Sequence, residues 1–220
     1  MCIQTLNIGV LASGRGSNFQ SILDEIGKGR LRAEVRILIT DNPSAYAIER
    51  AKKNRIESLV IRPKEFATKD EFYRTVTDEL KKKEVELVVL AGFMRIVGAP
   101  LINAFPNRIM NIHPALLPSF PGLHAQKQAV EYGVKFSGCT VHFVDKGMDT
   151  GPIIIQSAVP VYDSDTEETL SERILKLEHR IYPEAIKLFS ENKLKVEGRI
   201  VKILADTPSD SFLINPQITI

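Results

Sequence analysis

The chain has 220 residues, 44% hydrophobic and 25% charged, with 29 Lys and Arg residues against 27 Asp and Glu residues. This composition can bury a core, which excludes wholesale disorder, and the net charge of +2 argues against a dedicated nucleic-acid binder. Two cysteines, Cys2 and Cys139, form no disulfide framework and are typical of a reducing cytosol. The first apolar run, at 6–12, is too short to span a membrane and follows no basic region, so we expect a cytoplasmic protein without a signal peptide.

Short apolar runs rich in β-branched residues alternate with amphipathic stretches through the first half of the chain. The apolar runs, which predict strands, are 6–12, 35–40, 58–61, 87–91 and 109–112. The stretches with helical spacing are 18–28, 45–54 and 70–84. Continuous apolar strands separated by helices indicate an α/β fold with an open, doubly wound, mostly parallel sheet that is covered on both faces.

The pattern changes in the second half of the chain. Two strand-like runs, 137–144 and 152–161, have only the loop 145–151 between them, so we expect them to pair antiparallel or to lie at the sheet edge. A long helix over 166–190 follows, and a strand is predicted at 196–204. We therefore expect one domain over 1–204 and a loosely ordered tail over 205–220.

The segment S13-G-R-G-S-N18 lies between the first predicted strand and the first predicted helix. Its glycines allow a tight turn, and Ser17 and Asn18 are natural N-cap residues, so free backbone N–H groups at the helix start could bind a phosphate. Arg15-Gly16 stands where a P-loop needs Lys-Ser/Thr, and Phe19 stands where the dinucleotide fingerprint needs a small residue. The segment thus favours a monophosphate, with a simple strand–helix turn as the alternative.

Two polar residues, Asn111 and His113, stand two positions apart at the end of a predicted strand, so their side chains share one face. The carboxyl ends of strands in an open α/β sheet form the ligand crevice, and Pro114 ends the strand there. The alternative interpretation is a structural histidine held by hydrogen bonds.

Asp149, in a loop flanked by glycines, follows a strand that carries His142, and both could reach the same crevice. A carboxylate beside a histidine favours the charged imidazole, which suits His113 as a general acid or oxyanion stabiliser, with Asn111 as an oxyanion donor. No serine or cysteine is placed as a nucleophile, which favours direct attack of one bound substrate on another. His113, His142 and Asp149 also have the composition of a metal site, but their spacing matches no metal motif, so we expect no metal.

Further motifs accompany these residues in chain order: Gly14–Asn18, Val89–Ile96, Met110–Pro118, His124, Val141–Val144, Asp149–Pro152 and Glu178–Pro183. Taken together, they resemble the phosphoribosylglycinamide formyltransferase family of purine biosynthesis, from about residue 7 to about residue 204. The resemblance implies a one-carbon transferase that uses 10-formyltetrahydrofolate as co-substrate and 5′-phosphoribosylglycinamide as acceptor. It implies small-molecule partners, no nucleic acid, no membrane, and a monomer or homodimer.

The resemblance also implies the roles of individual residues. The catalytic trio would be Asn111, His113 and Asp149. The ribonucleotide would be bound by Gly16, Ser17 and Asn18 at its phosphate, and by Glu178. The folate would be bound by Lys69, Met94, Arg95, Ile96, Val97, Asn111, Asp145, Lys146, Gly147, Met148 and Asp149. The role of Arg15 and of the 205–220 tail stays open.

Other functions share parts of this pattern. Methionyl-tRNA formyltransferase would have a further domain and a basic surface, and formyltetrahydrofolate hydrolase would have an additional N-terminal domain. A phosphate-binding module without catalysis would have no need of the Asn111, His113 and Asp149 set. Transfer to another amine acceptor also remains an alternative.

Overall fold

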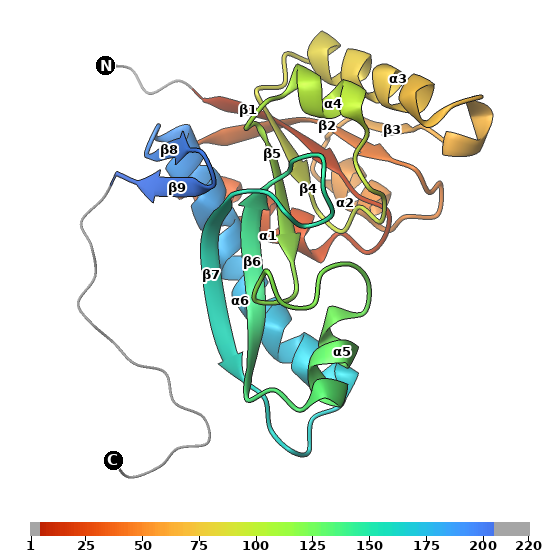
Figure 1. The fold of residues 1–220 in the computed structure, drawn as a ribbon. Helices are drawn as coiled ribbons and strands as arrows, with labels where there is room; N and C mark the ends of the chain where they lie inside the picture. Colours follow the sequence, from red (N-terminus) through yellow and green to blue (C-terminus); the bar gives the residue numbers. More distant parts are fainter. Residues whose placement is uncertain (1–4, 205–220) are drawn as a thin grey trace.

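A nine-stranded sheet runs through residues 5–204, the part of the chain that the computed structural model describes (Figure 1). The strands are β1 Leu6–Leu11, β2 Ala33–Thr40, β3 Ser58–Val60, β4 Leu87–Leu90, β5 Ile109–His113, β6 Phe136–Phe143, β7 Ile153–Pro160, β8 Leu194–Glu197 and β9 Ile200–Ile203. Their order across the sheet is β3-β2-β1-β4-β5-β6-β7-β9-β8. The predicted α/β class is confirmed.

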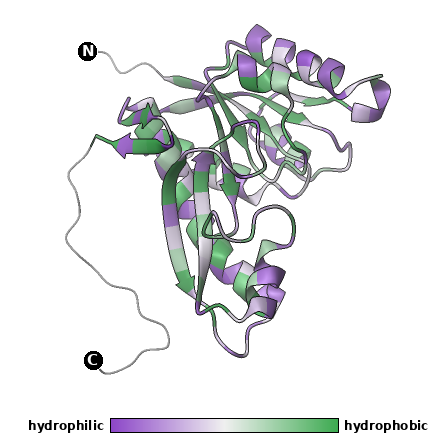
Figure 2. Ribbon diagram, in the orientation of Figure 1, coloured by the Kyte–Doolittle hydropathy of each residue, from purple (hydrophilic) through white to green (hydrophobic). Residues whose placement is uncertain are grey.

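The helices cover both faces of the sheet and enclose two cores. They are α1 Ser17–Gly27, α2 Ala47–Lys53, α3 Lys69–Lys82, α4 Ala99–Ala104, α5 Ala125–Tyr132 and α6 Glu167–Ser190, with a 3₁₀ turn at Pro63–Glu65. One core packs against α1, α2, α5 and α6, and the other packs against α3 and α4. Strand β4 shows why: Leu87 and Val89 enter the first core, while Val88 and Leu90 enter the second. In Figure 2 the parallel strands are accordingly largely apolar, whereas the helices carry polar outer faces.

The strand directions change along the sheet. From β3 to β5 all neighbours are parallel, and β5, β6 and β7 then pair antiparallel, as predicted for the runs 137–144 and 152–161. The chain builds outward from β1 through β2 to β3, then returns to the other side of β1 with β4. This reversal makes a topological switch point, where open α/β sheets bind ligands beyond the carboxyl ends of their strands.

One strand prediction is wrong. The run 196–204 was expected to be a single strand, but it forms most of a hairpin in which β8 pairs antiparallel with β9. Gly198 has φ +61° between them, a conformation that suits glycine in a tight turn. The predicted tail 205–220 lies outside the described residues. Within 5–204, no helix combines the length and the apolar character needed to cross a bilayer.

The long helix α6 begins where it was predicted and ties the central strands together. Thr166 is its N-cap and forms a capping box with Thr169. Further along, the hydroxyl of the fully buried Tyr182 lies 2.9 Å from the carbonyl oxygens of Leu90 and Met110. Because these carbonyls belong to β4 and β5, Tyr182 stabilises the strands that lead into the switch point.

Candidate active site

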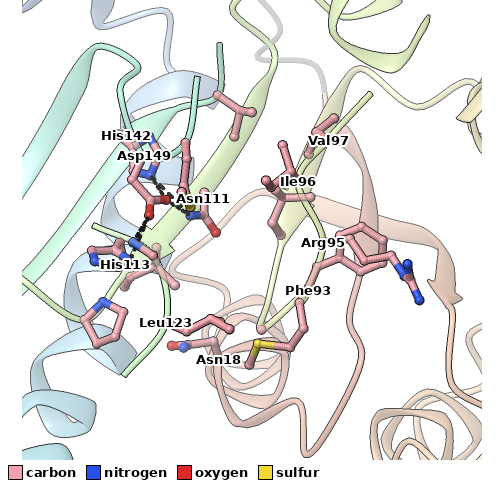
Figure 3. A pocket seen from close by; sticks show the side chains of 18 of the residues that line it. Asn18, Phe93, Arg95, Ile96, Val97, Asn111, His113, Leu123, His142 and Asp149 are labelled. Atoms are coloured by element: carbon pink, nitrogen blue, oxygen red, sulfur yellow. Dashed lines mark hydrogen bonds and ion pairs between the residues drawn. The ribbon is translucent and has the colours of Figure 1, made fainter. Parts of the chain in front are cut away.

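A cavity of about 600 Å³ opens at the switch point, beyond the carboxyl ends of β4 and β5. Figure 3 shows its polar side, with Asn111, His113, His142 and Asp149, facing Phe93 and the following residues across the cavity. The lining residues are Asn18, Leu90, Gly92, Phe93, Met94, Arg95, Ile96, Val97, Asn111, Ile112, His113, Pro114, Gly122, Leu123, His124, Gln126, His142, Val144, Asp145, Gly147, Met148, Asp149 and Glu178. This volume suits a drug-sized ligand.

The predicted catalytic residues meet in this cavity. Asn111 and His113 come from the end of β5, and Asp149 comes from the loop between β6 and β7. Nδ1 of His113 lies 3.4 Å from Oδ2 of Asp149, and Nδ2 of Asn111 lies 3.5 Å from Oδ1 of the same carboxylate. The end of β5 and the loop between β6 and β7 thus bring these three side chains within a few ångströms of one another.

The imidazole of His113 is held in one orientation. Its Nε2 lies 2.8 Å from the backbone oxygen of Phe120, and the residue is only 4% exposed. A carbonyl oxygen only accepts hydrogen bonds, so Nε2 carries a hydrogen. The other ring nitrogen, Nδ1, is therefore the one that can gain or lose a proton, and it faces the cavity beside Asp149.

Asp149 is positioned by its backbone and by a neighbouring loop. It has φ +55°, an unusual value for a residue with a side chain, and its Oδ2 accepts a hydrogen bond of 2.8 Å from the backbone N–H of Gly122. Gly151 lets this loop lie against β6, because a Cβ there would come within 1.7 Å of the Phe143 carbonyl oxygen. Within the same loop, Asp145 accepts bonds from the Gly147 N–H and the Thr150 hydroxyl.

His142 also faces the cavity, from β6. Its Nε2 lies 3.2 Å from Nδ2 of Asn111 and 3.7 Å from Oδ1 of Asp149. Burial lowers the pKa of His142, although the Phe143 carbonyl and the Asp149 carboxylate act in the opposite direction. Within 5–204, no three His, Cys, Asp or Glu residues are grouped so that they could hold a metal ion.

The 13–18 loop and the start of α1 lie at one end of the cavity. The N-cap of α1 is Gly16, with φ +65° and ψ +37°, so the prediction of Ser17 or Asn18 as the cap is wrong. A Cβ on Gly16 would lie 2.9 Å from the Ala47 Cβ, which explains why glycine rather than serine makes this turn. No side chain caps the helix, so its first N–H groups remain available for an anion.

Asn18 and Glu178 form a buried pair beside that helix start. Nδ2 of Asn18 donates a 2.7 Å hydrogen bond to Oε2 of Glu178, and both residues line the cavity. Burial raises the pKa of Glu178, and the hydrogen bond from Asn18 partly offsets this. Oδ1 of Asn18 is buried without a hydrogen-bond partner, although such atoms are normally satisfied.

The segment after β4 forms the wall of the cavity opposite Asn111, His113 and Asp149, and it was predicted to line a folate pocket. Met94 is 69% exposed and Ile96 53% exposed, so apolar surface faces the open cavity. The segment is anchored by Arg95, whose Nε lies 2.5 Å from Oδ2 of Asp41, and by the Tyr73 hydroxyl, which donates to the Ile96 carbonyl. The backbone N–H of Met94 donates to Oγ of Ser13, which joins this wall to the 13–18 loop.

Some predicted residues do not line the cavity. Gly16 and Ser17 lie at the start of α1, and Lys146 lies in the loop between β6 and β7. Lys69 lies at the start of α3, with its ammonium group 5.8 Å from the ring centre of Tyr73. Conversely, the stretch 122–126 contributes to the lining although no site role was predicted for it. The only signal in the sequence was the glycine and histidine that follow the proline-rich segment.

The chain is similar to known formyltransferases along most of its length. The family model "Formyl transferase" matches residues 6–186. Phosphoribosylglycinamide formyltransferase of Bacillus subtilis is 47% identical over 81% of this chain and 91% of its own length. A trifunctional purine biosynthetic protein of Drosophila pseudoobscura pseudoobscura is 43% identical over 92% of this chain, which spans only 15% of that longer protein. The crystal structure of glycinamide ribonucleotide transformylase 1 from Symbiobacterium toebii superposes with a TM-score of 0.90 at 52% identity, covering 91% of this chain and 95% of that one.

Proposed function

Because the chain belongs to the phosphoribosylglycinamide formyltransferases, we propose that Asn111, His113 and Asp149 carry out its chemistry. The enzyme transfers the formyl group of 10-formyltetrahydrofolate to the amine of 5′-phosphoribosylglycinamide in purine biosynthesis. The observation that carries the residue assignment is the meeting of these three side chains on one wall of the cavity, with His113 Nδ1 3.4 Å from Asp149.

The reaction begins with attack of the ribonucleotide amine on the formyl carbon. The carbonyl oxygen becomes an oxyanion, which accepts hydrogen bonds from Nδ2 of Asn111 and from protonated Nδ1 of His113. The carboxylate of Asp149 stabilises the charged imidazole and accepts from a water that relays the amine proton to the folate nitrogen. The bond from the formyl carbon to that nitrogen then breaks, which leaves tetrahydrofolate and the formylated amine.

The two substrates occupy opposite ends of the cavity in this proposal. The phosphate of the ribonucleotide binds the free N–H groups of residues 16–18, where the helix dipole of α1 favours an anion, and Glu178 contacts the same substrate. The folate lies against the exposed apolar side chains of 94–97, with the loop 145–149 over its pterin ring. Lys69, a basic residue outside the cavity lining, would lie near the folate tail.

Further proposals concern the whole protein. We expect one domain over 1–204, in the cytoplasm, as a monomer or homodimer. The near-neutral charge of +2 supports small-molecule partners without nucleic acid. The continuous nine-stranded sheet supports a single domain.

The test measures tetrahydrofolate formation by absorbance, with and without 5′-phosphoribosylglycinamide. We expect formation only with the ribonucleotide, and a fall in kcat on the order of 100- to 1000-fold in Asn111→Ala and in His113→Ala. Product formation without the ribonucleotide would indicate hydrolysis instead of transfer. Near-normal turnover in either variant would refute the role of that residue.

A further inference from the structure

The register of two antiparallel strands places His142 directly opposite Asn111. In the pairing of β5 with β6, the Cα partner of Asn111 is His142 and that of His113 is Thr140. Side chains at directly opposite positions project from the same face and interact. His142 therefore faces Asn111 because of the sheet itself, and its position does not depend on a flexible loop.

The hydrogen bonds of His142 define which ring nitrogen can accept. Nδ1 lies 2.9 Å from the backbone oxygen of Phe143, which only accepts, so Nδ1 carries a hydrogen. In the neutral ring, Nε2 is then an acceptor, and Nδ2 of Asn111 lies 3.2 Å away as its donor. The residue is 2% exposed, and this burial favours the neutral ring.

This contact controls the orientation of the Asn111 amide. With one N–H held by His142, the second N–H of Nδ2 points toward Oδ1 of Asp149, which at 3.5 Å is at the outer limit of a hydrogen bond. That second N–H is thus only weakly engaged, so in the same orientation it stays available to an oxyanion that develops beside Asp149. A flipped amide would place the Asn111 oxygen against the lone pair of Nε2, which is repulsive.

We propose that His142 is a positioning residue, which accepts one N–H of Asn111 so that the other N–H is presented to the oxyanion. The inference rests on the proposed role of Asn111 in formyl transfer and deepens it. His142 does not touch the reacting atoms. Its contribution passes through Asn111, in the way that second partners orient groups that act directly on a substrate.

The test compares His142→Leu, which removes the acceptor, with His142→Gln, whose side-chain carbonyl offers an acceptor at a similar reach. We expect His142→Leu to lower kcat on the order of 10- to 100-fold, less than the loss of the donor itself, with each KM changed by less than about twofold. His142→Gln should retain kcat within about threefold of the original enzyme. If His142→Leu does not fold, His142→Met carries the same comparison, because its flexible thioether fills the space but accepts only weakly.

A double-mutant cycle separates positioning from a general structural effect. In the Asn111→Ala background, His142→Leu should lower kcat by no more than about twofold, because the group through which it acts is gone. An equally large effect in both backgrounds, a normal kcat for His142→Leu, or a glutamine variant as slow as the leucine variant would overturn the inference. Near-normal kcat for Asn111→Ala alone would instead overturn the proposed function of Asn111.

Discussion

Replacing Asp149 with asparagine removes one charge from the proposed catalytic trio of Asn111, His113 and Asp149 while keeping the shape of the side chain. The variant Asp149→Asn can still accept the N–H of Gly122 through its remaining oxygen. It loses the attraction between the carboxylate and protonated His113, whose closest atoms are 3.4 Å apart. Two unit charges at that separation attract by about 5 kcal/mol at an effective dielectric constant of about 20, and by about 1 kcal/mol in bulk water. The His113 and Asp149 side chains are only 6% and 14% exposed, so the effect should lie well above the bulk-water figure. We expect kcat to fall on the order of 100- to 1000-fold, which corresponds to about 3 to 4 kcal/mol.

The assay is steady-state formation of tetrahydrofolate, with kcat and both KM values determined separately. The matched control is Asp163→Asn, the same substitution at a carboxylate that is 93% exposed and paired with Lys135 away from the cavity. The control should keep the original kcat. If Asp149→Asn also keeps kcat within about threefold, the charge of Asp149 does not support the charged imidazole, and the electrostatic reasoning is refuted.

Three further predictions follow from other contacts. Gly16→Ala should raise the KM for the ribonucleotide about tenfold, because φ +65° costs a residue with a Cβ about 1–2 kcal/mol. The control Gly14→Ala, which has open space around the new Cβ, should change this KM little, and equal effects of the two substitutions would contradict the prediction. Tyr182→Phe should lower the free energy of unfolding in urea by about 1–2 kcal/mol through the lost hydrogen bonds to β4 and β5, and an unchanged midpoint would contradict this. Arg173→Met should remove the ion pair that holds the pKa of Asp165 well below its usual range. A carboxyl group whose pKa is lowered by folding stabilises the fold at pH values above its unfolded pKa of about 3.9. The original protein should therefore exceed Arg173→Met in free energy of unfolding by more at pH 7 than at about pH 3, and an equal difference at both pH values would refute this prediction.

Much of the architecture could be read from the sequence because it depends on local periodicity. Continuous apolar runs between amphipathic helices predicted the parallel part of the sheet, and the short 145–151 connection predicted the antiparallel pair that follows it. Two local predictions failed for a common reason. Gly16 and Gly198 each adopt a positive φ, and this places a helix start and a hairpin turn where composition alone suggested a serine cap and a continuous strand.

The identities of Asn111, His113 and Asp149 as candidate site residues were also available from the sequence, since two of them share a strand face and the third follows a nearby strand. The distances and orientations of these side chains relative to one another were not available from the sequence. The carbonyl of Phe120 that orients His113, and the register that sets His142 against Asn111, depend on how distant segments pack. Sequence spacing determines which face of a strand a side chain occupies, whereas the distance and direction between two side chains are decided only when the sheet and its loops assemble.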